Sequence, residues 1–158
     1  MKISIKKETL LKPLTYVVGV VEKRQTLPIL GNVFIKSVSN HLTIIGTDLE
    51  TEITTFLNKV ESEDGEITVG ARKLFDIVRS MPDGAIINLD AKRENKVIVS
   101  SGRTRFTLQT LPAKDFPRLE VSDWDSEFKV SRSDLSGLLG ATQFAMAQQD
   151  VRYFLNGL

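Results

Sequence analysis

The sequence contains no cysteine and a single histidine, His41. Without cysteine the chain has no disulfide framework, no thiol nucleophile and no thiolate ligand for a metal. One histidine leaves little for a zinc site or for imidazole catalysis. No apolar run approaches the roughly 20 residues of a membrane-spanning helix, and no signal-type stretch follows the first residues. These absences predict a cytoplasmic, non-enzymatic protein without metal or cofactor.

An excess of either charge sign is also missing, since 21 Lys and Arg face 20 Asp and Glu. The distribution is nevertheless uneven: residues 1–24 and 71–105 are net basic, whereas residues 25–66 and 106–158 are net acidic. A protein that binds nucleic acid through bulk charge alone is usually basic overall. This chain could at most present basic stripes on an otherwise acidic body. Alternating surface charge that serves solubility accounts for the same pattern.

Catalytic motifs are absent as well. The chain has no phosphate-binding loop, no Gly-x-Gly-x-x-Gly after a strand and no Gly-x-Ser-x-Gly. Asp48, Glu50 and Glu52 alternate on a predicted strand and would point to one side of it. A hydrolase with a divalent metal there would need further ligands, so a solvated strand face is the preferred interpretation.

At 158 residues and 41% hydrophobic, the chain has the composition of a globular protein. Apolar residues at helical spacing predict one helix over about residues 8–22 and another over residues 71–81. Pro13 is tolerable in the first helix if that helix starts near Thr9. Polar and apolar alternation and turn signals predict strands over residues 2–6, 33–38, 42–46, 50–57, 66–69, 86–90, 96–100 and 104–110.

The order of these elements, a strand, a helix and several strands, occurs twice. This internal duplication predicts an α+β fold in which two helices pack side by side on antiparallel sheets. Residues 111–125 are irregular and indicate a domain boundary, with a first domain over residues 1–122 and the start of a second over 123–158.

The second domain repeats the pattern, with a strand over residues 127–131, a helix from about residue 133 to 147 capped by Ser131, and the beginning of another strand from Val151. The inner face of that helix would be lined by Leu135, Leu138, Leu139 and Thr142. A strand and a helix cannot bury their apolar faces without a sheet, so we expect the chain to be a fragment of a longer protein.

Cations occupy the polar faces of the two helices of the first domain. If the helices pack side by side, these faces form one basic surface that contacts phosphates and carries no base code. Two solvated helix faces would look the same in the sequence.

Several segments resemble the bacterial beta sliding clamp family, the processivity subunit of the replicative DNA polymerase. They run in order along almost the whole chain: TLPILGN (26–32), GTDLE (46–50), ARKLFDI (71–77), SGRTRF (101–106), TLPAKDFP (110–117) and AMAQQDVRY (145–153). The resemblance implies a DNA-clamp fold and a non-catalytic, three-domain subunit without cofactor. It also implies a homodimeric ring around double-stranded DNA, loaded by a clamp loader and bound by polymerase through short peptide motifs.

The resemblance also implies roles for individual residues. DNA-facing positions would be Arg24, Arg72, Arg79, Gln149 and Tyr153, with Lys12 added on helical geometry alone. Dimer-interface positions would be Lys73, Lys96, Arg103, Arg105, Phe106 and Leu108. Arg152 and Leu155 would lie at the rim of the pocket for partner peptides. Later residues of the family's chain form most of that pocket.

Two alternatives remain at this point. In the first, Phe106 and Leu108 share one face of a strand with Arg103 and Arg105 and form apolar anchors flanked by charges at the dimer interface. In the second, Phe106 and Leu108 belong to the domain's own core. A freestanding protein-interaction module with basic helix faces for an acidic partner would also fit the charge pattern.

Overall fold

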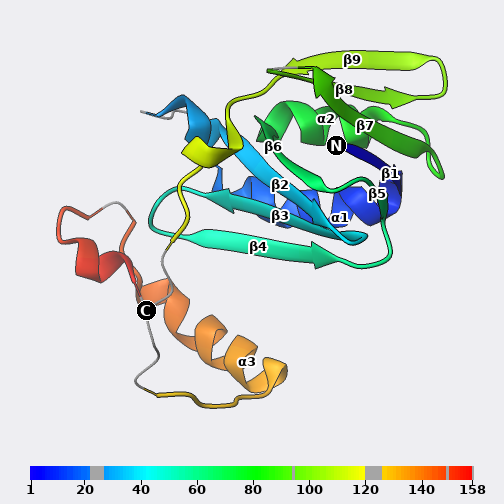
Figure 1. The fold of residues 1–158 in the computed structure, drawn as a ribbon. Coiled ribbons are helices and arrows are strands. Elements are labelled where there is room, and N and C mark those ends of the chain that lie inside the picture. The colour runs from blue at the N-terminus through cyan, green and yellow to red at the C-terminus, as the bar shows by residue number, and fades with distance from the viewer. Residues whose placement is uncertain (22–26, 94, 120–125, 149, 158) are drawn as a thin grey trace. The chain divides into compact units, whose positions relative to one another are not determined.

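The computed structural model describes residues 1–21, 27–93, 95–119, 126–148 and 150–157 (Figure 1). The chain divides into two compact units, here called unit 1 (Met1–Glu120) and unit 2 (Val121–Leu158). Within the described ranges, no helix is long and apolar enough to cross a membrane.

Unit 1 contains the strand–helix–strands pattern twice. The elements of the first repeat are β1 (Lys2–Lys6), α1 (Lys7–Val20), β2 (Asn32–Val38), β3 (His41–Thr47) and β4 (Glu52–Leu57). Those of the second are β6 (Gly65–Gly70), α2 (Ala71–Ser80), β7 (Ile86–Arg93), β8 (Lys96–Ser101) and β9 (Thr104–Gln109). The short strand β5 (Glu61–Ser62) and the 3-10 turns η1 (Pro28–Gly31) and η2 (Ala113–Asp115) complete the unit.

The two repeats exchange their first strands. One sheet has the order β5-β1-β7-β8-β9 and the other the order β4-β3-β2-β6, with antiparallel neighbours throughout. The first strand of each repeat therefore pairs with the second strand of the other repeat, β1 with β7 and β6 with β2. The predicted α+β fold with two helices on antiparallel sheets is confirmed (Figure 1).

The helices α1 and α2 pack against each other and run in opposite directions. Lys7, at the start of α1, donates from Nζ to the Met81 carbonyl at the end of α2 (2.5 Å). Arg72, at the start of α2, donates from Nη2 to the Val21 carbonyl at the end of α1 (2.8 Å). Cations at helix C-termini satisfy free carbonyls and complement the helix dipole, so each helix stabilises the end of the other.

The main core lies between this helix pair and the two sheets. Leu10, Leu14 and Val17 of α1 and Leu74 and Val78 of α2 are all fully buried there. A second, smaller cluster forms on the other face of the β4-β3-β2-β6 sheet, where Phe34 and Ile45 are covered by Phe116. The segment after β9 therefore crosses the outer face of that sheet.

Two expectations about unit 1 are wrong in detail. Helix α1 begins at Lys7, so Pro13 lies in its interior and leaves the Thr9 carbonyl without the donor that residue 13 would supply. Strand β4 begins only at Glu52, and Asp48 and Glu50 lie in the preceding turn, where Asp48 Oδ1 accepts from the backbone N–H groups of Glu50 (3.0 Å) and Thr51 (2.7 Å). The three acids therefore do not share a strand face, and no metal-binding cluster occurs among the residues that the structure describes.

Unit 2 contains α3 (Arg132–Thr142), η3 (Gln143–Ala145) and η4 (Tyr153–Asn156). The predicted cap is confirmed, since Ser131 Oγ accepts from the Asp134 backbone N–H at 3.1 Å. The strands predicted over residues 127–131 and from Val151 are wrong: the first segment is irregular and the second turns into η4. A strand requires a hydrogen-bonded neighbour, and none occurs among the described residues of unit 2.

Candidate functional site

The candidate site consists of the exposed faces of α1 and α2. On α1 the buried stripe leaves Glu8, Lys12 and Tyr16 exposed at helical spacing. On α2 the exposed residues are Arg72, Lys73, Asp76, Arg79 and Ser80. Both faces point away from the core because the opposite stripes are fully buried. Because α1 and α2 pack against each other, the exposed cations Lys12, Arg72 and Arg79 lie on neighbouring helices.

The exposed faces of α1 and α2, here called the two-helix face, carry more cations than acids. Both of its acids, Glu8 and Asp76, already have hydrogen-bond partners. Glu8 accepts a hydrogen bond from the Gly84 backbone N–H at 2.6 Å, and this bond lowers the pKa of the Glu8 carboxyl. Asp76 pairs with Arg79 one turn later, at 2.9 Å. The face thus keeps a positive balance around neutral pH.

The two arginines differ in how freely they can meet a ligand. The Arg79 side chain is 63% exposed, and its guanidinium lies 5.2 Å from the centre of the Phe75 ring. Stacking and the Asp76 pair orient the guanidinium while leaving N–H groups open to solvent. Arg72 commits Nη2 to the Val21 carbonyl, so its role is partly structural.

The other predicted DNA-facing residues are Arg24, Gln149 and Tyr153. Arg24 and Gln149 lie outside the described residues, and for Tyr153 only the backbone, at the start of η4, is described.

The predicted interface residues surround β9, which is an edge strand of its sheet. Phe106 lies opposite Val99 and Leu108 opposite Val97, so both continue the core-facing rows of β8. Leu108 packs on the core, whereas Phe106 remains 36% exposed. Arg105 lies opposite Ser100 on the other face of the sheet, so the shared parity with Phe106 and Leu108 is wrong. The other predicted interface residues, Lys73 on α2, Lys96 on β8 and Arg103 in the turn between β8 and β9, are exposed.

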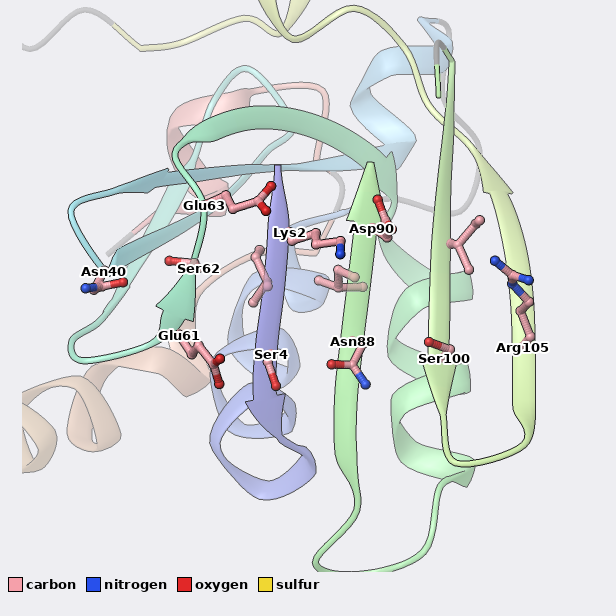
Figure 2. Close-up of a pocket in the computed structure, with 13 residues that line it drawn as sticks. Lys2, Ser4, Asn40, Glu61, Ser62, Glu63, Asn88, Asp90, Ser100 and Arg105 are labelled. Carbon is pink, nitrogen blue, oxygen red and sulfur yellow. The ribbon is translucent and has the colours of Figure 1, made fainter. Parts of the chain in front are cut away.

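The outer face of the five-stranded sheet carries a polar hollow that the sequence did not indicate (Figure 2). One row of opposed residues crosses it from strand to strand: Glu61, Ser4, Asn88, Ser100 and Arg105. Each occupies the outward position of its strand, which is the signal that alternation would have offered. The row mixes an acid, a base and neutral groups and favours no particular ligand.

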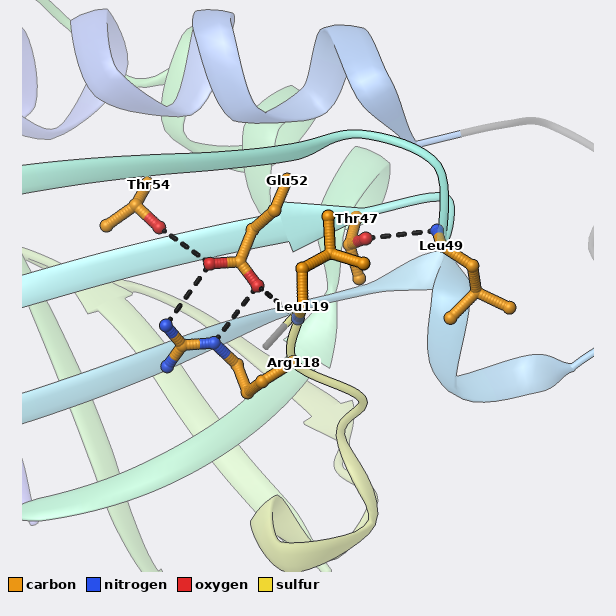
Figure 3. A network of polar contacts seen from close by, with 6 residues as sticks. All are labelled: Thr47, Leu49, Glu52, Thr54, Arg118 and Leu119. Carbon is orange, nitrogen blue, oxygen red and sulfur yellow. Dashed lines mark hydrogen bonds and ion pairs between the residues drawn. The ribbon is translucent and has the colours of Figure 1, made fainter. Parts of the chain in front are cut away.

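A polar network at the end of unit 1 was also missed (Figure 3). Arg118 holds Glu52 through two parallel hydrogen bonds, Nε to Oε2 and Nη2 to Oε1, both at 3.1 Å. Burial of the Glu52 carboxyl acts to raise its pKa, but the bonds from Arg118 and from the Leu119 N–H outweigh burial, and the pKa lies below the usual 4.5. The two residues are 66 positions apart, and no spacing pattern in the sequence links them.

In unit 2, the predicted pocket-rim residues lie within one short turn. Arg152 pairs with Asp150 through Nη2 and Oδ2 at 3.0 Å, and this hydrogen bond lowers the pKa of the Asp150 carboxyl. The Leu155 N–H donates to the Arg152 carbonyl at 2.9 Å, and Leu155 remains 36% exposed.

Comparison with known proteins identifies the family. Residues 1–120 match the family model described as the DNA polymerase III beta subunit, N-terminal domain. The chain is 49% identical over 159 residues to the beta sliding clamp of Pseudomonas aeruginosa and 48% identical over 161 residues to that of Escherichia coli. All of this chain is covered in both alignments, but it spans only 43% of the length of either relative.

Solved structures agree with this assignment. A crystal structure of a DnaN sliding clamp from Pseudomonas aeruginosa bound to griselimycin has a TM-score of 0.93 and 50% identity, covering 99% of this chain and 42% of that one. The beta sliding clamp of Caulobacter crescentus reaches the same TM-score of 0.93 at 38% identity, covering 100% of this chain and 42% of that one. The chain therefore belongs to the DNA polymerase III beta-subunit family.

Proposed function

We propose that this chain is the N-terminal part of a sliding clamp subunit. The complete subunit would form a homodimeric ring around duplex DNA in the cytoplasm and would hold the replicative polymerase on its template without catalysing a reaction. A clamp loader would place the ring on DNA, and the loader and polymerase would bind it through short peptide motifs. The relatives named beta sliding clamp support this proposal.

The observation that carries the proposal is the helix pair with its cationic exposed face. Lys12, Arg72 and Arg79 lie on the exposed faces of the helices α1 and α2. Cations of this kind contact phosphates in any sequence and release counterions, so the contacts are salt-sensitive and easily exchanged. Such contacts suit a protein that moves along DNA and is retained by enclosure.

The site residues follow from the same proposal. Arg24, Arg72, Arg79, Lys12, Gln149 and Tyr153 would face DNA. The edge strand β9, with Phe106 as its most exposed apolar residue, would join the partner subunit together with Lys73, Lys96, Arg103, Arg105 and Leu108. Arg152 and Leu155 would contribute to the peptide-pocket rim.

The test compares DNA topologies with the complete subunit. After loading, we expect the subunit to stay on nicked circular DNA and to run off linear DNA of the same sequence, at a salt concentration that removes ordinary phosphate binding. Retention is measured by gel filtration of labelled protein. Equal retention on both DNAs would contradict enclosure. A complete lack of duplex binding even at low salt would favour a protein-interaction module.

A further inference from the structure

The last segment of unit 1 is attached to the outer face of the β4-β3-β2-β6 sheet at two points. Phe116 is buried against Phe34, with ring centres 5.5 Å apart. Beyond it, Arg118 and Leu119 are both bound by the side chain of Glu52 (Figure 3). Leu119 is the second-to-last residue of unit 1, which ends at Glu120. The second attachment therefore lies where the chain leaves unit 1.

The Glu52 carboxylate is unusually well occupied for a residue near the surface. Its Oε1 accepts from Arg118 Nη2 and from Thr54 Oγ1, both at 3.1 Å. Its Oε2 accepts from Arg118 Nε at 3.1 Å and from the Leu119 backbone N–H at 3.2 Å. The side chain is only 14% exposed. Four donors from three residues thus meet one carboxylate.

This arrangement fixes direction as well as position. A planar guanidinium that binds a carboxylate through two parallel bonds has little rotational freedom, in contrast to a lysine pair. The additional bond from the Leu119 N–H holds the backbone itself. An exposed ion pair contributes little on its own, but here Glu52 stands on a strand whose position the sheet determines.

We propose that Glu52 is a positioning residue that fixes the end of unit 1 and hence the point from which the chain continues toward unit 2. Loss of the Glu52 carboxylate would free the last residues of unit 1 while Phe116 keeps the rest of the segment in place. In a closed ring, a fixed point at which each chain leaves unit 1 would favour the same curvature in both subunits. This consequence rests on the proposed function, whereas the role of Glu52 does not.

The test uses the absence of native cysteine, which allows two spin labels to be placed cleanly. Ser80→Cys on α2 and Ser136→Cys on α3 are exposed positions, one in each unit. In this labelled chain we expect Glu52→Gln to widen the distribution of label-to-label distances about twofold, measured by pulsed electron spin resonance. Glu50→Gln is the matched control, because it makes the same charge change in an exposed side chain two residues away and should leave the width unchanged.

A second readout separates positioning from general destabilisation. Hydrogen exchange at the Leu119 amide should accelerate about tenfold in Glu52→Gln, while the amides of β2 and β3 keep their protection. Arg118→Lys keeps the charge but loses the paired bonds, and it should give an intermediate width. An unchanged distance distribution in folded Glu52→Gln, or equal widening in Glu50→Gln, would overturn the proposal. No DNA or partner enters this experiment, so its failure is distinct from a failure of the clamp function.

Discussion

At the residue scale, the hydroxyl of Thr68 uses all of its hydrogen-bonding capacity. Thr68 is fully buried on β6. Its Oγ1 accepts from Asn32 Nδ2 and from the Leu111 backbone N–H, both at 3.1 Å, and donates to the Leu111 carbonyl at 2.7 Å. A hydroxyl offers one donor and two acceptor positions. One side chain thus joins β6 to the segment that follows the edge strand β9.

We therefore expect Thr68→Val to destabilise unit 1 by about 2–4 kcal/mol, since a valine of the same shape leaves the buried Asn32 amide and the part-buried Leu111 backbone groups without their partner. Thr68→Ser keeps the hydroxyl and loses one methyl group, so it should cost about 1 kcal/mol. Urea unfolding of the two variants measures the difference. Equal losses would mean that packing of the methyl group, and not the hydroxyl, is what matters at this position.

At the element scale, α1 approaches β3 so closely that only glycine fits between them. A Cβ atom on Gly46 would lie 2.6 Å from Val17 Cγ1 and 3.0 Å from the Val17 carbonyl oxygen. Val17 is fully buried, so its side chain has little room to rotate, and its carbonyl oxygen cannot move without shifting α1.

Gly46→Ala should destabilise unit 1 by about 1–3 kcal/mol through this overpacking. Gly19→Ala is the matched control, because a Cβ at this position of α1 would meet none of the described residues beyond the adjoining helix backbone within 4 Å, and alanine favours helices; it should stabilise by about 0.5–1 kcal/mol. Thermal melting gives both values. A neutral Gly46→Ala would show that α1 can slide away from β3 at little cost.

Most helices and strands of unit 1 could be predicted from the sequence. Both helices of unit 1 were found to within two residues, because their apolar stripes face one core, and most strands were found through alternation. The strand predicted over residues 127–131 failed because alternation indicates a face to bury and not whether a pairing strand is present. The acids before Thr51 were misread because the Asp48 side chain closes a turn that resembles the start of a strand.

The candidate site was predictable to a similar degree. Helical spacing placed Lys12, Arg72 and Arg79 on exposed faces, and the structure has them there. The bonds of Arg72 to Val21 and of Arg118 to Glu52 were not predictable, because each joins positions more than 50 residues apart. Only the packing of the two helices and the return of the chain over the sheet bring these groups together.

At the scale of the whole molecule, the proposed DNA-facing and subunit-pairing roles should separate by mutation in the complete subunit. Arg24→Ala combined with Arg79→Ala should weaken DNA binding and lower the slope of log affinity against log salt by about 2, one for each phosphate contact. Dimerisation, followed by sedimentation, should be unaffected. Phe106→Ala should do the reverse, loosening the dimer and leaving the salt slope unchanged. A double arginine variant that falls apart into monomers would contradict the assignment.

The exchange of first strands between the repeats has a consequence for synthesis. Emerging residues 1–57 hold β1 without its eventual neighbour β7, and β2 without β6. The β4-β3-β2-β6 sheet can close once residue 70 has been made, but the sheet that contains β1 must wait for the far end of the unit. Because long-range pairing is the slow part of folding, β1 is made before the other strands of unit 1 but is among the last to complete its pairing, and neither repeat can mature alone.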